Sequence, residues 1–292
     1  MARQVYIDGE FLPEEDAKIS IFDHGFLYGD GVFEGIRSYE GLVFCLDEHI
    51  DRLYKSARAI ALEVPIPRDE FADVIVETLR RNSLLSGYVR PIVTRGCGDL
   101  GLDPRKCPKP SVIVAADKLT LYPEEFYRDG LEVTFVSTRR NIPDALPPQV
   151  KSLNYLNNIL GRLEVNRMGV GEGIMLNALG FIAEATADNV FIVKEGVLKT
   201  PTTSSGALPG ITRSCVLELA REEGIPVEET ELTPYDLYAA DECFLTGTGA
   251  EVVPVRAVEG RPVGTGRPGP MTRKLIEKFR NLTKSRGRRY EL

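Results

Sequence analysis

The spacing of hydrophobic and polar residues in the first part of the chain predicts both strands and helices. Residues 3–7 are predicted to form a strand, and Asp8-Gly9, which follows it, is a pair typical of a hairpin turn. From Asp47 to Ala61 the apolar residues recur at helical spacing, and Asp47 is the predicted N-cap. The other elements predicted here are a strand over 17–22, a helix over about 68–83, and strands over about 88–95 and 111–116.

The pattern restarts after the stretch 117–127, where one β-rich run ends and another begins at Leu131. We therefore predict a small α/β domain at 1–117, an interdomain linker at 118–127 and a large domain at 128–292. Strands and helices come in runs rather than in strict alternation, which indicates an α+β or mixed α/β class. In the large domain we predict strands over about 131–138, 173–177, 181–184, 189–193, 242–246 and 253–258, and helices over about 153–168, 211–224 and 270–285.

Composition then restricts the possible functions. With 43% hydrophobic and 27% charged residues, the 292-residue chain has the make-up of a folded protein and not of a disordered one. A net charge of −7 disfavours binding to nucleic acid or to acidic membranes. The sequence shows no signal peptide and no apolar run long enough to span a membrane, so we expect a cytoplasmic protein. The two histidines exclude a three-histidine metal site, and the five cysteines, without a C-x-x-C pair, predict neither a zinc ribbon nor a disulfide framework.

Three local features could carry chemistry, and each also has a plainer interpretation. Ile211 opens a helix after a Pro-Gly pair, so its first N–H groups and the Thr212 hydroxyl could bind a phosphate, or form an ordinary helix start. The turn at 247–249 joins two predicted strands and could bind an anion through its amides, or be a simple glycine turn. Lys151 precedes Tyr155 on one short segment, and it could be a Schiff-base nucleophile or a solvated lysine.

Taken together and in this order, these features resemble the branched-chain amino acid aminotransferases, which are class IV pyridoxal-phosphate aminotransferases of the type IV fold. The resemblance runs from FDHGFLYGDGVFEGIR at 22–37, through GTGAEVVPV at 247–255, to the PGPMTRKL helix beyond. It implies a two-domain fold with the active site between the domains, a large domain that binds the cofactor, and pyridoxal 5'-phosphate as that cofactor. The Gly- and Pro-rich loop at 96–110 resembles, around Gly98–Gly101, the segment that reaches a neighbouring subunit, which implies a homodimer or a higher homo-oligomer.

The resemblance also implies the residues that bind the cofactor. Lys151, in the K-x-L-N-Y-L setting, would form the Schiff base and move a proton between the substrate Cα and the cofactor. Tyr155 would hydrogen-bond the phenolic oxygen, and Glu184 would pair with the pyridine nitrogen. The remaining cofactor-binding residues that it implies are Arg52, Ile211, Thr212 and Thr248 at the phosphate and Leu208 against the ring.

A second group of residues is implied for the substrates, which would be leucine, isoleucine or valine and 2-oxoglutarate, used in a ping-pong reaction. Tyr88 would hold the α-carboxylate with the turn at 248–250, and Arg90 would hold the side-chain carboxylate of glutamate. Ala185 and Ala187 stand where the family often has glycine, and they add two methyl groups near the cofactor. The implied substrate-binding residues are Tyr28, Phe33, Arg37, Tyr88, Arg90, Gly249 and Ala250.

Two alternatives remain open from the sequence. The first keeps the cofactor but changes the substrate: a transaminase of D-amino acids or (R)-amines, or an aminodeoxychorismate lyase. Tyr88 and Arg90 disfavour the D-amino acid and lyase interpretations, because D-amino acid enzymes carry an R-x-H strand instead. The second is a binding or scaffold protein without cofactor, which has no need of Lys151, Glu184 and Arg52 together.

Overall fold

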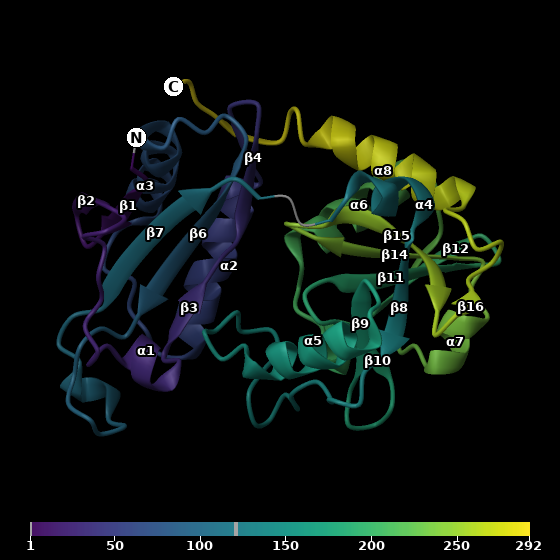
Figure 1. The fold of residues 1–292 in the computed structure, drawn as a ribbon, viewed down its shortest axis with the longest axis horizontal. Helices are drawn as coiled ribbons and strands as arrows, with labels where there is room; N and C mark the ends of the chain where they lie inside the picture. The colour runs from purple at the N-terminus through teal and green to yellow at the C-terminus, as the bar shows by residue number, and fades with distance from the viewer. Residues whose placement is uncertain (1, 120–121) are drawn as a thin grey trace. The chain divides into compact units, whose positions relative to one another are not determined.

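The chain folds into two compact units, each of which is described by itself (Figure 1). The computed structural model describes residues 2–119 and 122–292. Unit 1 comprises Met1–Leu119, Val150–Asn154 and Thr283–Leu292, and unit 2 comprises Thr120–Gln149 and Tyr155–Leu282. Residues 120 and 121 of the predicted linker lie outside the described residues, and the predicted domain bounds 1–117 and 128–292 stay predictions.

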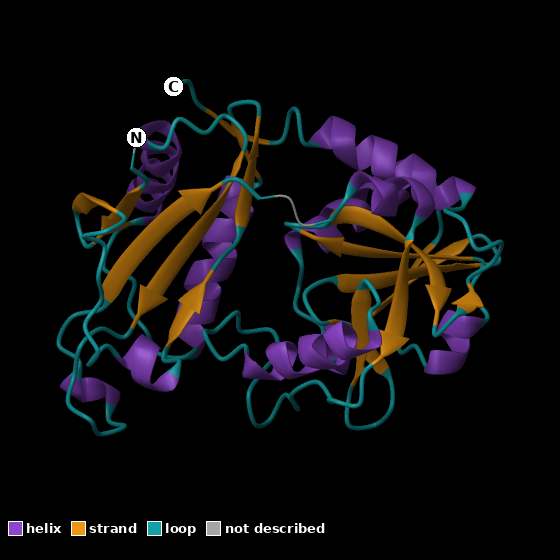
Figure 2. Cartoon of the chain, in the orientation of Figure 1, coloured by secondary structure: helices purple, strands orange, loops and turns teal. Residues whose placement is uncertain are grey.

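Unit 1 contains an antiparallel sheet and two long helices (Figures 1 and 2). Within the described residues, its strands follow the spatial order β17-β5-β4-β6-β7-β1-β2, with β3 paired to β6. The strands are β1 (Gln4–Ile7), β2 (Glu10–Pro13), β3 (Gly31–Phe33), β4 (Ile36–Tyr39), β5 (Leu42–Phe44), β6 (Gly87–Thr94), β7 (Ser111–Asp117) and β17 (Gly287–Arg289). The helices are α1 (His24–Tyr28), α2 (Leu46–Ala59), α3 (Arg68–Arg81) and the 3-10 turn η1 (Pro104–Lys106).

The core of unit 1 forms between one face of this sheet and the helices α2 and α3. Val89 and Val93 are fully buried on β6, and they join a cluster that includes Leu53 of α2 and Phe71 of α3. Each such side chain contributes about 1.5–3 kcal/mol of burial free energy. Because side chains alternate along a strand, Arg90 and Ile92 project to the opposite face, where Arg90 is exposed.

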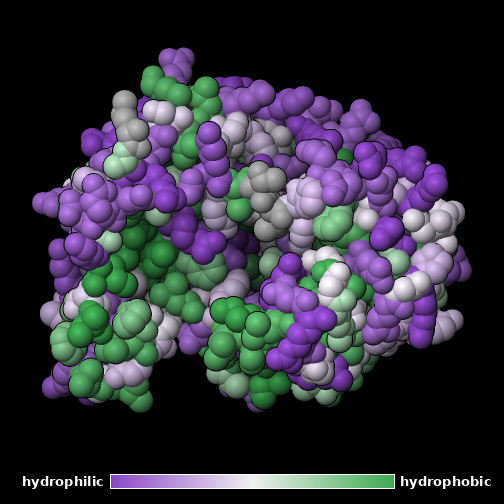
Figure 3. Space-filling model, in the orientation of Figure 1, coloured by the Kyte–Doolittle hydropathy of each residue, from purple (hydrophilic) through white to green (hydrophobic). Residues whose placement is uncertain are grey.

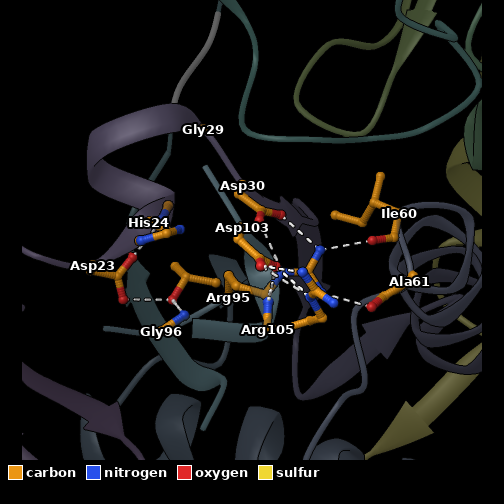
Figure 4. A network of polar contacts seen from close by, with 12 residues as sticks. Asp23, His24, Gly29, Asp30, Ile60, Ala61, Arg95, Gly96, Asp103 and Arg105 are labelled. Atoms are coloured by element: carbon orange, nitrogen blue, oxygen red, sulfur yellow. Dashed lines mark hydrogen bonds and ion pairs between the residues drawn. The ribbon is translucent and has the colours of Figure 1, made fainter. Parts of the chain in front are cut away.

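A polar network holds α1 and the start of the long loop 96–110 in place (Figure 4). Asp23 caps α1 by accepting hydrogen bonds from backbone amides of the helix, and Thr94 Oγ1 donates to its other oxygen at 2.7 Å. Arg95 donates through Nε to Asp30 at 2.9 Å and through Nη1 to the Ala61 carbonyl at 2.7 Å, just beyond the end of α2. The guanidinium therefore ties the turn before β3 to the C-terminal end of α2, where a cation is favourable.

Unit 2 contains a larger mixed sheet whose strands follow the order β10-β9-β8-β15-β14-β11-β12-β13, with β16 paired to β15. Every residue of β9 and β10 is buried, and α6 and α8 both contact β14. The strands are β8 (Leu131–Phe135), β9 (Glu172–Leu176), β10 (Ile182–Ala185), β11 (Asn189–Lys194), β12 (Val197–Pro201), β13 (Val227–Thr230), β14 (Glu242–Gly247), β15 (Glu251–Val258) and β16 (Arg261–Pro262). The helices are α4 (Glu124–Asp129), α5 (Leu156–Met168), η2 (Thr203–Ser205), α6 (Ile211–Glu222), α7 (Pro234–Tyr238) and α8 (Pro270–Leu282).

None of the helices in the described residues combines the length and the apolar character needed to cross a membrane. The cytoplasmic location stays a prediction.

The mixed α and β class and most predicted elements are confirmed, but two local predictions are wrong. Residues 17–22 form no strand, because the two-residue turn Asp8-Gly9 makes the partner of β1 begin at once, and β2 occupies 10–13. Asp47 is not the N-cap of α2: Cys45 takes that position with φ of 48°. Asp47 lies in the first turn, where its charge still favours the positive end of the helix.

Candidate functional site

Lys151 belongs to the short segment of unit 1 that follows the Pro-rich loop 141–150. Its backbone N–H donates to Ser56 Oγ at 3.2 Å, and its carbonyl accepts from the Phe33 amide at 3.0 Å. The next residue, Ser152, forms an isolated bridge with Val32 of β3. The Lys151 Nζ lies 4.7 Å from the centroid of the Phe33 ring, within the range of a cation–π contact. The lysine is therefore anchored at the end of β3, and it is only partly buried.

The same aromatic ring also carries a second cation. Arg90 Cζ lies 4.8 Å from the centroid of Phe33, and Arg90 Nη2 donates to Tyr88 Oη at 3.0 Å. Gly35 makes this arrangement possible, because a Cβ there would lie 1.8 Å from Tyr88 Oη. An amine and a guanidinium thus lie over one apolar ring, and a phenol is hydrogen-bonded to the guanidinium, so this surface suits either a carboxylate or an aliphatic side chain.

Arg52 is held by a buried anion that the sequence analysis missed. Glu34 is fully buried, and it accepts from Arg52 Nε at 2.7 Å, from Arg52 Nη2 at 2.8 Å and from His49 Nδ1 at 2.8 Å. Burial alone would raise the pKa of Glu34, but the charge and hydrogen bonds of Arg52, followed by the hydrogen bond of His49, hold this pKa far below its usual range. Burial lowers the pKa of His49, so its ring is neutral at neutral pH and donates Nδ1–H to Glu34.

Two further predicted residues of unit 1 make contacts elsewhere. Tyr28, at the end of α1, donates its hydroxyl to the Leu100 carbonyl in the long loop at 2.6 Å. Arg37, on β4, places its Cζ 4.8 Å from the centroid of the Tyr39 ring. Neither contact involves Lys151, so the substrate-binding roles of these two residues stay predictions.

In unit 2 the centre of the candidate site is Glu184, which is buried on β10. Arg140 Nη2 lies 2.9 Å from Glu184 Oε1, and the other oxygen accepts from the Leu208 amide at 2.8 Å and from Asn189 Nδ2 at 3.3 Å. Arg140 is itself 5% exposed. A paired cation and N–H donors stabilise the ionised form of this carboxylate.

The start of α6 adjoins Glu184 through Asn189. Gly210 packs against Asn189, because a Cβ at that glycine would lie 2.0 Å from Asn189 Oδ1. The helix begins at Ile211 without a side-chain cap, so the amides of its first turn are suited to an anion. Thr246, which pairs with Asn189 between β14 and β11, has a buried hydroxyl for which the described residues offer no hydrogen-bond partner.

The remaining predicted cofactor residues occupy distinct places in unit 2. Thr212 is buried in the first turn of α6, and Tyr155 is partly buried at the N-cap position of α5. In the turn between β14 and β15, Thr248 and Gly249 are partly buried and Ala250 is buried. The structure places Thr212 and the turn among residues that could bind an anion, and the individual roles stay predictions.

A second group of buried carboxylates lies against this turn. A Cβ at Gly247 would lie 1.9 Å from Asp188 Oδ1, so only glycine lets the turn pack over that carboxyl. Tyr122 Oη lies 3.2 Å from Glu172 Oε2 and 3.3 Å from Asp188 Oδ2. Burial, followed by the charges of Glu172 and Glu184, raises the pKa of Asp188 above its usual range.

Comparison with known proteins identifies close relatives. The profile of the amino-transferase class IV family matches residues 31–258. A putative branched-chain-amino-acid aminotransferase of Methanocaldococcus jannaschii is 52% identical over 279 residues, which cover 96% of each chain. The crystal structure of the Escherichia coli branched-chain amino acid aminotransferase is similar at a TM-score of 0.94, with 39% identity over 97% of this chain and 95% of that one. The crystal structure of the T.th. branched-chain amino acid aminotransferase with pyridoxamine 5'-phosphate is similar at a TM-score of 0.93. The two chains are 36% identical over 98% of this chain and 96% of that one.

Proposed function

Since the chain belongs to the amino-transferase class IV family, we propose that it is an enzyme that uses pyridoxal 5'-phosphate to transfer the amino group of branched-chain L-amino acids to 2-oxoglutarate. The 52% identity over nearly the full length of both chains supports this activity. The observation that carries it is the surface around Phe33, where the Lys151 amine and the Arg90 guanidinium lie against one ring. A nucleophilic amine beside a carboxylate-binding cation is what transamination of an amino acid requires.

The residues present fit the cofactor. A phosphate matches the uncapped start of α6, where Thr212 is buried in the first turn. A protonated pyridine nitrogen matches Glu184, whose charge Arg140 stabilises. The unpartnered Thr246 hydroxyl on the adjoining strand is a further polar group that a bound ligand can satisfy. Arg52, Tyr155, Leu208, Ile211 and Thr248 keep the cofactor-binding roles predicted from the sequence.

Each residue has one task in the proposed reaction. When bound, pyridoxal phosphate accepts the electron pair of the bond that is broken at the substrate Cα. Lys151 Nζ would take the proton from that Cα and deliver it to C4′ of the bound cofactor. Glu184 holds a proton on the pyridine nitrogen, and the Tyr155 hydroxyl donates to the phenolic oxygen. Hydrolysis by one water molecule would release the 2-oxo acid and leave the amino group on the cofactor before 2-oxoglutarate binds, and the same residues would then act in reverse order.

Arg90 and Tyr88 can explain how one site accepts substrates with an aliphatic side chain as well as glutamate, whose side chain is a carboxylate. The guanidinium and the phenol are joined by a 3.0 Å hydrogen bond, and Arg90 lies over the Phe33 ring. We propose that an aliphatic side chain packs on the ring, whereas the side-chain carboxylate of glutamate pairs with Arg90. Tyr88, Gly249 and Ala250 keep the α-carboxylate-binding roles predicted from the sequence.

We also propose that the protein acts as a homodimer or a larger homo-oligomer. Leu156, Ile159, Leu160 and Leu163 lie at helical spacing on α5, and each is exposed by 45% or more. Figure 3 shows hydrophobic side chains gathered over this helix. A contiguous apolar face of this kind favours contact with another chain, and most soluble oligomers are built from identical copies. Sedimentation of the wild type and of Leu160→Glu tests this, and we expect the variant to dissociate.

The proposed activity is tested by the absorption spectrum of the protein loaded with pyridoxal phosphate. We expect a visible band that L-leucine removes and 2-oxoglutarate restores. A band that ignores L-leucine but responds to a D-amino acid or an (R)-amine would move the function to the alternative substrates. If no band forms with pyridoxal phosphate, the proposed function is wrong.

A further inference from the structure

Unit 2 contains a pair of buried carboxyls that the proposed reaction does not use. Glu172, at the start of β9, and Asp188, just before β11, are 1% and 4% exposed. Tyr122 lies between them, with its hydroxyl oxygen 3.2 Å from one carboxyl and 3.3 Å from the other. Burying two adjacent negative charges is strongly unfavourable unless a cation or a proton accompanies them.

The two carboxyls differ in the hydrogen bonds that they accept. Glu172 accepts from the Gly173 amide at 2.8 Å, from the Thr186 hydroxyl and from Arg162 Nη1 at 3.2 Å. The contact that Asp188 makes is with the Tyr122 hydroxyl. A phenol has one proton to donate, so it cannot donate to both carboxylates. If Asp188 is protonated, it donates to Tyr122 Oη while Tyr122 donates to Glu172, and both contacts become hydrogen bonds.

Asp188 also lies directly against the turn at Gly247. A Cβ at Gly247 would lie 1.9 Å from Asp188 Oδ1, so the carboxyl packs directly against the backbone of this turn. The titratable and charged groups that act on Asp188 are Glu172 of β9, Glu184 of β10, Arg162 of α5 and Tyr122. The single cation among them, Arg162, is 44% exposed at its side chain, so water screens it.

We propose that Asp188 is a positioning residue whose protonated carboxyl supports the turn at 247–249, and that loss of its proton weakens the binding of a phosphate there. The inference rests on the proposed function, in which Thr248 of this turn contacts the cofactor phosphate. A charge on Asp188 would lie behind the turn in a region of low dielectric, where it repels a second anion strongly. Phosphate binding and the proton on Asp188 therefore support each other.

The test measures binding of pyridoxal phosphate to the full-length protein freed of cofactor, by equilibrium dialysis at about pH 6.5 and about pH 8.5. The wild type is compared with Asp188→Asn, which keeps the shape of the carboxyl but cannot ionise. Titration of Lys151 and of the phosphate is common to both proteins and cancels in the ratio of their dissociation constants. We expect the wild type to lose affinity relative to Asp188→Asn by about tenfold over this range, as a pKa that differs by about one between the free and the bound protein would produce.

A second variant keeps the inference testable if Asp188→Asn does not fold. Glu172→Gln removes the neighbouring charge, so Asp188 loses its proton at lower pH and the loss of affinity shifts toward acid. A merely structural role for the pair would not move this pH profile. If all three proteins bind pyridoxal phosphate with the same pH dependence of the affinity, this inference is overturned and the proposed function is not affected. If the wild type fails to bind pyridoxal phosphate at either pH, the proposed function is overturned and the inference with it.

Discussion

In unit 1 the carboxylate of Glu34 is completely buried, and Arg52 and His49 both donate hydrogen bonds to it. In unit 2 the carboxyls of Glu172 and Asp188 are buried almost as completely, but the nearest cation is the half-exposed Arg162. The first group balances its charge with a buried permanent cation, whereas the second has one partly exposed cation for two carboxyls and needs a proton as well. We therefore expect Glu34 to stay ionised across the neutral range and Asp188 to titrate within it.

The largest effect is expected for a substitution of Lys151 in unit 1, which should abolish catalysis but leave the ligand-binding residues of unit 2 unchanged. We expect Lys151→Ala to lower turnover of L-leucine with 2-oxoglutarate by about a thousandfold or more, because no other group replaces the nucleophile. Pyridoxal phosphate should still bind, since the start of α6 and Glu184 are unchanged. Turnover assays and equilibrium dialysis measure the two properties separately. Lys55→Ala, an exposed lysine of α2, is the control, and normal turnover in Lys151→Ala would contradict the assignment.

The next prediction concerns the balance of charges in unit 1. Glu34→Gln leaves the Arg52 guanidinium buried without its anion, and we expect the free energy of unfolding to fall by about 3–5 kcal/mol. Urea unfolding measures this change. Glu48→Gln is the matched control, because Glu48 pairs with Arg286 at 2.8 Å on the surface and should contribute less than about 1 kcal/mol. If the free energy of unfolding falls by the same small amount in both variants, the buried pair of Glu34 and Arg52 does not stabilise unit 1 more than a surface pair does.

The sequence predicted those parts of the site that lie within one continuous motif. Lys151 and Tyr155 lie on one short segment, and Glu184 begins the motif E-A-T-A-D-N at 184–189. These three residues could therefore be proposed without knowledge of the fold. Helix α6 was predicted from its start signal and apolar spacing, both of which are local. The roles of these residues come from resemblance, because spacing alone left each of them with a plainer interpretation.

The supporting residues could not be predicted in this way. His49 and Arg52 lie three positions apart on α2 and so share a face, but nothing in the sequence shows that Glu34 meets them from the strand region. Arg140 reaches Glu184 from a loop without any periodic pattern. Strands β3 and β5 have three residues each, which is too short for alternation to be seen. The contacts of Glu34 and of Arg140 form only through tertiary packing, which no local sequence pattern records.

The third prediction uses the opposite directions in which folding moves two carboxyl pKa values. Folding raises the pKa of Asp188, so its contribution to stability is present at low pH and is lost as pH rises through the folded pKa. Asp188→Asn should therefore gain stability relative to the wild type on going from about pH 4 to about pH 8, by about 1.4 kcal/mol for each pH unit that separates the folded from the unfolded pKa. For Glu34 the folded pKa is lowered, so its contribution is present above the usual carboxyl range and is lost on acidification. Urea unfolding at several pH values checks both slopes, and slopes of the same sign would refute the comparison.

The smallest effect distinguishes an exposed cation of unit 1 from the buried one. Arg90 lies over Phe33 on the open face of the sheet, whereas Arg52 is 8% exposed. We expect Arg90→Ala to raise the KM for 2-oxoglutarate by about ten- to a hundredfold, since a charged hydrogen bond contributes about 1.5–3 kcal/mol. The KM for L-leucine should change only a few-fold, because its side chain has no charge to lose. Steady-state kinetics with each substrate varied in turn gives both values.

Arg68→Ala provides the control for this last variant, because Arg68 Cζ also lies over an aromatic ring of unit 1, 5.0 Å from the centroid of Tyr54. Neither variant should change the free energy of unfolding by more than about 1 kcal/mol, since both guanidinium groups are in contact with water. A selective effect of Arg90→Ala on the dicarboxylic substrate then identifies Arg90 as a group that recognises charge rather than one that supports the fold. An equal rise of KM for both substrates would mean that Arg90 acts through the common α-carboxylate or by positioning Tyr88, and the proposed division between the two side chains would have to be abandoned.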